Sequence, residues 1–105
     1  MEIFCRRLKA ARKAAGMSQE RLGLLAGIEP ASASARMNQY ETGKHSPNTG
    51  TVSLIAKVLN VPSSYFYSED EEEARLLLLF YRMNTVGRAR VLELAIQLMD
   101  NPQGI

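Results

Sequence analysis

Short helical segments, each closed by a glycine or a proline, constrain the fold of this chain more than any other feature. Apolar residues recur at helical spacing from residue 2 to residue 15, and no stretch alternates between apolar and polar residues as a strand would. The segments end at Gly16, Gly27, Gly43 and Val61-Pro62. The sequence therefore predicts an all-α chain whose residues 1–67 form a compact domain of five short helices.

Capping residues place the starts of these helices. Ser18 precedes the second segment, and Asn48 follows Pro47 at the start of the fourth. The fifth is the short stretch SSYFY, whose Tyr65 and Phe66 we expect to close the apolar core.

Residues 68–105 predict a separate C-terminal hairpin of two helices. Ser68 and Glu71 have the spacing of a capping box and favour a helix start there. Both helices are apolar over more of their circumference than one small core can cover. We expect the hairpin to pair with a second copy through Leu76, Leu77, Phe80, Leu92, Ile96 and Met99. The alternative is packing against the chain's own first domain.

Charge is distributed unevenly between these two parts. Residues 1–67 hold nine basic and four acidic side chains, whereas residues 68–105 hold four basic and seven acidic ones. A basic first part favours a polyanionic partner, although a chance imbalance of solvated charges gives the same pattern. The acidic run at residues 69–73 favours a helix start, where the helix dipole stabilises it, over an acidic interaction tail.

Several functional classes are excluded by what the sequence lacks. Its longest apolar run, residues 76–81, is far shorter than the roughly 20 residues that span a bilayer, and its start does not resemble a secretory signal. His45 and Cys5 are the only histidine and cysteine, so they supply neither a Cys/His metal site nor an internal disulfide. No nucleophile elbow or phosphate-binding loop occurs. We expect a cytoplasmic protein that is not an enzyme and uses no metal, cofactor, membrane or small-molecule ligand.

Two stretches of the first 67 residues resemble a known family. They are LKAARKAAGMSQERLGLLAGI and MNQYETGKHSPNTGTVSLIAKVLNVPSSYFY. Their ordered signals, among them Ser18-Gln19, Glu41-x-Gly43 and Ile55-Ala56, are similar to those of the phage-repressor/Cro-like (Xre-type) helix-turn-helix regulators. The resemblance implies a repressor-like five-helix domain whose third helix enters the major groove of DNA. It also implies that this helix crosses close to Gly23.

The resemblance further implies which side chains serve the DNA contact. The matching positions are Gln19, Ser34, Ala35, Arg36, Asn38, Gln39, Lys44 and His45. In this set, Arg36 either reads guanine or clamps a phosphate, and His45 either meets the DNA backbone or belongs to a plain polar loop. Arg12 and Glu41 are implied to form a structural ion pair, against the alternative of two solvated charges.

The chain departs from the family between Gly27 and Gly43. These glycines lie 16 positions apart, where the family's usual spacing is about 12, so roughly one helical turn has been added. Pro30 suits the first position of a helix, and ASASA favours helix after it. We expect the third helix to extend back to Glu29-Pro30. The rival is an irregular turn, with the helix capped by Ser34.

These observations predict a sequence-specific transcriptional regulator that binds a palindromic operator as a homodimer. They favour a repressor. The alternative is an antitoxin-like protein whose acidic hairpin grips a protein partner. A weaker alternative is a helix-turn-helix fold used only for protein contacts, which the basic first part and Gln39 speak against.

Overall fold

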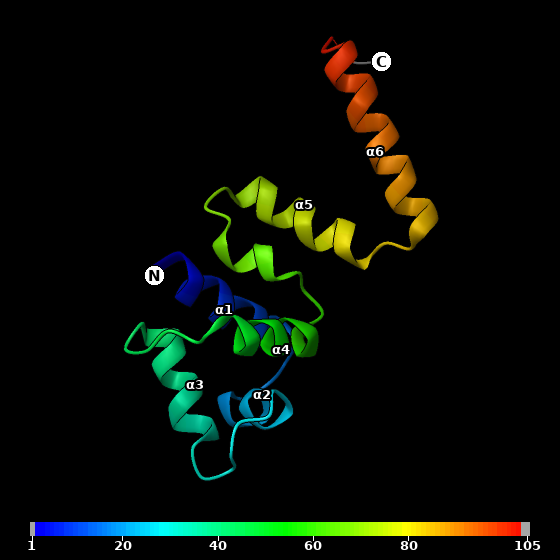
Figure 1. Ribbon diagram of the computed structural model, residues 1–105. Coiled ribbons are helices and arrows are strands. Elements are labelled where there is room, and N and C mark those ends of the chain that lie inside the picture. Colours follow the sequence, from blue (N-terminus) through cyan, green and yellow to red (C-terminus); the bar gives the residue numbers. More distant parts are fainter. Residues whose placement is uncertain (1, 104–105) are drawn as a thin grey trace.

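Helices make up all the regular structure in the computed structural model, which describes residues 2–103 (Figure 1). The predicted all-α class, a helix-turn-helix domain followed by two C-terminal helices, is confirmed. The elements in chain order are α1 (Glu2–Ala14), α2 (Gln19–Leu25), α3 (Ala33–Thr42), α4 (Thr49–Leu59), the 3₁₀ helix η1 (Ser63–Tyr67), α5 (Glu71–Arg82) and α6 (Thr85–Asp100). None of the helices in the described part of the chain combines the length and apolar character that a bilayer crossing needs.

Local capping explains where the first helices begin and end. The side chain of Ser18 accepts a hydrogen bond from the backbone N–H of Arg21 at 3.0 Å, and that of Asn48 accepts from Thr51 at 2.8 Å. Each bond satisfies an N–H group that a helix start would otherwise leave without a partner. Gly43 ends α3 with a φ of 81°, a left-handed conformation that favours glycine.

One apolar core joins the first five elements. Its largest fully buried side chains are Phe4, Leu8, Leu22, Met37, Ile55, Val61 and Phe66. The rings of Phe4 and Phe66 lie 5.3 Å apart, which brings η1 onto α1. Tyr65 and Phe66 therefore close the core, as the sequence predicts. Burial of Met37 fixes the register of α3 against α2 and α4.

α2 and α3 approach each other closely at Gly23. A Cβ atom added there would lie 2.8 Å from the backbone oxygen of Ala33, closer than atoms pack. Because that oxygen belongs to the main chain, a side chain at this position requires the two helices to separate. Gly23 therefore permits the helix–helix contact on which the helix-turn-helix arrangement depends.

We expect Gly23→Ala to lower the free energy of unfolding by about 1–3 kcal/mol, because the added methyl group overpacks the contact. Gly50→Ala is the matched control, since the nearest atom to its added Cβ is the side-chain oxygen of Asn48 at 3.4 Å. Helix propensity alone should make the control neutral or stabilising by up to about 1 kcal/mol. Urea denaturation of both variants measures the difference. Equal effects would contradict a close contact at Gly23.

The added residues before α3 form a turn, so the predicted extension of the helix to Glu29-Pro30 is wrong. α3 begins at Ala33, one residue before the Ser34 cap of the rival reading, and the cap position is Ser32. The N–H of Ser32 donates to the carbonyl of Glu29 at 2.9 Å, which places Pro30 second in a four-residue turn. Proline suits that position as well as it suits a helix start.

Tertiary contacts decide between these two structures. Ile28 packs against the core at the end of α2, and Ala33 is fully buried against Gly23. The connection must therefore lead from one fixed point to the other, which a straight continuation of α3 would prevent.

α5 packs on the helix-turn-helix domain, whereas α6 does not. Ala74 is buried in the common core and Leu78 lies against it. Asp70, not the predicted Ser68, caps α5 by accepting from the N–H of Glu73 at 3.0 Å. Ser68 is instead buried. Its carbonyl accepts from the guanidinium of Arg7, and its hydroxyl donates to Glu73 Oε1 at 2.6 Å. Beyond α5 the chain turns, and Figure 1 shows α6 projecting away from the other helices.

Candidate DNA-binding surface

α3 presents opposite faces to the core and to solvent. Its buried residues are Ala33, Met37, Tyr40 and Glu41, which share one face at helical spacing. The other side exposes Ser34, Ala35, Arg36 and Asn38 and half-exposes Gln39. The five α3 residues that the resemblance implies for DNA contact therefore lie on the solvent side of this helix or at its edge.

Glu41 joins three helices at the back of this surface. Arg12 of α1 donates through Nε to Glu41 Oε2 and through Nη2 to Glu41 Oε1, the latter at 3.1 Å. The two side chains are only 11% and 3% exposed, so the pair is largely removed from water. Its hydrogen bonds raise the pKa of Arg12 above the ordinary value, which keeps the guanidinium charged. A third donor, Gln19 Nε2, reaches Glu41 Oε1 at 3.1 Å.

Gln19 continues this network to the exposed side of α3. The same amide nitrogen lies 3.1 Å from Asn38 Oδ1. Gln19 is the first residue of α2, so its side chain connects the start of that helix to the middle of the next. A path of hydrogen bonds thus runs from half-buried Arg12 through buried Glu41 and then Gln19 to Asn38. It holds the orientation of α3 relative to α1 and α2.

The second half of α3 and the loop after it enclose a polar hollow. Its volume is about 330 Å³, and its lining residues are Arg36, Gln39, Tyr40, His45 and Ser46. The N–H of His45 donates to the carbonyl of Gln39 at 3.3 Å, which folds the loop back onto the helix. The structure therefore brings together Arg36, Gln39 and His45. A guanidinium, an amide, an imidazole and a hydroxyl in one place offer several donors to a phosphate oxygen.

The remaining implied DNA contacts lie outside this hollow. Lys44 is exposed in the loop directly after Gly43. Ser34 and Ala35 are the second and third residues of α3, directly after the turn that connects it to α2. Apart from Gln19 on α2, the implied residues thus follow the exposed side of α3 from its start to the loop beyond its end.

The residues predicted for pairing with a second copy are divided between half-buried and exposed positions. Leu77 and Phe80 of α5 are half-buried within the chain. Leu76, Leu92, Ile96 and Met99 are exposed, and Met99 is 80% accessible. Among the described residues of α6, none is buried. An apolar helix without intrachain cover is typical of an interface.

Sequence reasoning missed a structural role for Arg7. It counted this residue only as one basic charge, whereas the structure buries it to 5% exposure on the apolar face of α1. Phe4 and Ala11 lie three and four positions away on the same face, so the helical spacing contained the signal. An arginine on that face requires an acceptor inside the fold, because a buried charge is otherwise strongly destabilising.

Comparisons with known proteins agree with this geometry. A family model described as Helix-turn-helix matches residues 8–66. A crystal structure of the transcriptional regulator BswR superimposes with a TM-score of 0.85 at 44% sequence identity, covering 91% of this chain and 95% of that one. No curated protein sequence is significantly similar to the chain. The matched segment contains α2, α3 and the network around Glu41. The chain belongs to the Xre/Cro-like helix-turn-helix family.

Proposed function

We propose that this protein is a sequence-specific transcriptional repressor that binds a palindromic operator as a homodimer. Membership of a helix-turn-helix family and similarity to a transcriptional regulator support the broader role of a DNA-binding regulator. The observation that carries the proposal is the exposed polar face of α3, oriented by the path from Arg12 to Asn38. A repressor of this kind acts in the cytoplasm by occupying its operator, and we assign it no catalytic step.

Each contact residue has a distinct part in this proposal. Gln39, Ser34 and Ala35 face base edges in the major groove. Lys44, His45 and Asn38 meet phosphates, and Gln19 both contacts a phosphate and orients Asn38. Arg36 reaches either a guanine, with about 1–3 kcal/mol of discrimination, or a phosphate beside the hollow that it shares with His45.

The exposure of α6 supports the proposed dimer. Exposed apolar side chains cover both its flanks, and a second copy of the same helix is the partner with matching chemistry. Two-fold symmetry then places two copies of α3 on one face of the duplex, about 34 Å or a multiple of it apart. A palindromic operator is the DNA counterpart of that symmetry. Purification as an obligate complex with another protein would instead favour the antitoxin-like alternative.

Salt dependence tests the DNA contact. Affinity for a site selected from random DNA should fall with rising salt, with a log–log slope of about −0.9 per phosphate neutralised. Lys44→Gln should make the slope shallower by about 0.9 for each copy in the dimer. Lys57→Gln is the matched control, since it removes the same charge from the last turn of α4. Fluorescence anisotropy at several salt concentrations measures both slopes.

Wild-type binding that hardly changes between low and physiological salt would contradict a DNA-binding regulator. The same titrations, repeated with altered sites, show whether Arg36 contacts a base or a phosphate. If Arg36 reads a base, Arg36→Ala relaxes sequence preference at one base pair. If it binds a phosphate, the variant weakens binding to all sequences alike.

A further inference from the structure

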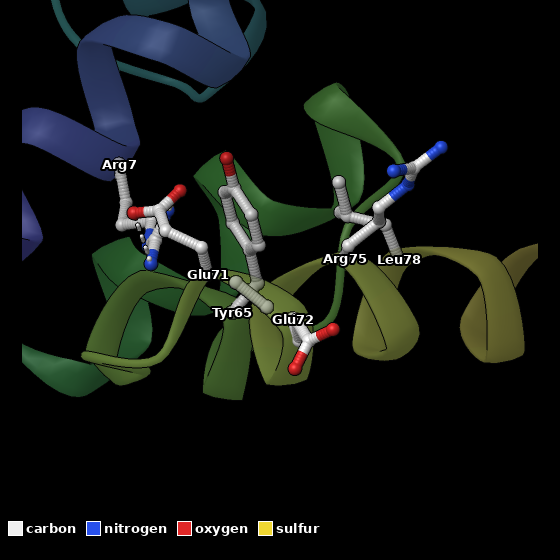
Figure 2. A pocket seen from close by; sticks show the side chains of 7 residues that line it. Arg7, Tyr65, Glu71, Glu72, Arg75 and Leu78 are labelled. Carbon is white, nitrogen blue, oxygen red and sulfur yellow. Dashed lines mark hydrogen bonds and ion pairs between the residues drawn. The ribbon is translucent and has the colours of Figure 1, made fainter.

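α5 is attached to the DNA-binding domain at its first turn by a buried arginine. Arg7 donates through Nε and Nη2 to the carbonyl of Ser68 at 3.0 and 2.9 Å, and through Nη1 to Glu71 Oε2 at 3.2 Å. Figure 2 shows Arg7 and Glu71 side by side at one end of a cavity that Tyr65 and Leu78 also line. Hydrogen bonds from Arg7 and then Arg6 lower the pKa of Glu71, so its carboxylate stays ionised.

The far end of α5 is attached as well. Arg82, its last residue, donates through Nε to the carbonyl of Asn60 at 2.9 Å. Asn60 is the C-cap of α4 and has a left-handed conformation with a φ of 57°. Between the two ends, Ala74 and Leu78 pack against the core. α5 is therefore a fixed part of the DNA-binding domain, and rotation of one against the other would break contacts along its whole length.

A third arginine holds the corner between α5 and α6. Arg88, in the first turn of α6, donates through Nε to the carbonyl of Phe80 at 3.0 Å and through Nη2 to that of Tyr81 at 2.7 Å. Its guanidinium lies over the Phe80 ring, 5.2 Å from the centroid. These carbonyls belong to the last turn of α5, where few N–H groups are left to bind them. The Phe80 carbonyl also accepts from the N–H of Met83, the C-cap of α5, at 3.2 Å. Arg88 adds the contact that reaches from α6 back to this turn, and so fixes the direction in which α6 leaves.

The other hydrogen bonds at this corner join residues within one helix end: Asn84 caps α6 by accepting from the N–H of Gly87 at 2.8 Å. Gly87 allows the chain to pass Met83 closely, since an added Cβ would lie 3.2 Å from the Cβ of Met83. Beyond it, no described residue of α6 is buried. The angle between the two helices therefore depends mainly on Arg88.

We propose that Arg88 is a positioning residue that sets the operator half-site spacing by fixing the angle between the DNA-binding domain and α6. The inference rests on the proposed function, in which α6 pairs with its copy. α5 leads from the corner into the DNA-binding domain and has 12 residues, so it is about 18 Å long at 1.5 Å per residue. A rotation of about 15° at the corner then moves the far end of α5 by about 5 Å, more than the 3.4 Å rise of one base pair.

The test is a spacing profile measured on the full chain. The palindromic site that wild type selects from random DNA is rebuilt with its central spacer changed in single-base-pair steps. Wild type should bind one spacing best. Arg88→Ala should remain dimeric but lose at least about tenfold of the discrimination between that spacing and its neighbours, or shift the optimum, because avidity depends on geometry. Sequence preference within each half-site should not change, which separates positioning from base contact.

Arg90→Ala is the matched control. Arg90 lies two positions further along α6, and within the described chain its side chain makes no hydrogen bond or ion pair with another residue. Its variant should keep the wild-type spacing profile. Arg88→Lys tests the planar fork, since lysine keeps the charge but cannot donate to both carbonyls in the same geometry. It should recover only part of the spacing discrimination.

Two results would overturn the inference. One is an Arg88→Ala dimer with the wild-type spacing profile. The other is loss of dimerisation in both Arg88→Ala and Arg88→Lys, since that would place Arg88 in the interface itself. Failure of the proposed function is seen earlier and separately, as a wild-type chain that stays monomeric or binds no DNA, and it would remove this inference as well.

Discussion

Replacing Arg12 by methionine should lower the free energy of unfolding by about 3–5 kcal/mol, because it leaves the buried carboxylate of Glu41 without its cation. Glu41 is only 3% exposed and would keep a single side-chain donor, Gln19. The loss is a large part of the total stability of a small domain. Urea denaturation followed by circular dichroism measures it.

A double variant distinguishes two contributions to the free energy of unfolding: the penalty of leaving the Glu41 carboxylate unpaired, and the net stabilisation by the Arg12–Glu41 pair. Replacing Glu41 by methionine in the Arg12→Met background should restore most of the lost stability, since apolar side chains of similar volume often replace a buried pair without cost. DNA affinity of the double variant should remain low, because Gln19 loses the acceptor that orients it toward Asn38. A loss below about 1 kcal/mol in the single variant would mean that the pair behaves as two solvated charges.

A chain ending at Asn84, without α6, should be a folded monomer. Its affinity for the palindromic operator should fall by about 100- to 10,000-fold, the contribution that linked half-site binding makes. Binding to a single half-site should change little. Analytical ultracentrifugation gives the oligomeric state, and anisotropy on full and half operators gives the two affinities.

The end point of this truncation follows from the contacts of α5. The sequence predicts a domain boundary after Tyr67, but a chain ending there would lose the Ser68 carbonyl that binds buried Arg7. We therefore expect the shorter chain to unfold at lower temperature than the one ending at Asn84, since a buried donor without a partner costs about 1–3 kcal/mol. A chain without α6 that still sediments as a dimer would place the interface elsewhere.

The sequence predicts well most helix ends that depend on neighbouring residues, although at α5 it favours Ser68 where Asp70 is the cap. Ser18, Asn48 and Gly43 define helix ends through bonds or backbone angles within a few positions, and the structure has all three. The start of α3 is different, because Pro30 fits a helix start and a turn equally well. That choice depends on Gly23 meeting Ala33, a contact between two helices that local propensity does not contain.

In the candidate site, too, the sequence predicts local features better than contacts between elements. Helical spacing and the resemblance identify the exposed positions of α3. They do not identify which of those positions meet in space. The hollow that joins Arg36, Gln39 and His45 depends on how the loop after Gly43 folds back, and Gln19 reaches Asn38 only because α2 crosses α3. Helical spacing places Arg7 on the buried face of α1 but does not identify its acceptors. Arg7 and Arg88 both donate to backbone carbonyls, which every sequence contains.

The turn between α2 and α3 makes this fold tolerant of insertions at one place. Its ends are pinned independently, at Ile28 by the core and at Ala33 by Gly23. Closing a longer loop between fixed ends costs only about 0.6 kcal/mol for each doubling of its length. Evolution can therefore lengthen or shorten this segment while the register of α3 stays constant. The shape of the α2–α3 turn can thus diverge among relatives faster than α3 itself.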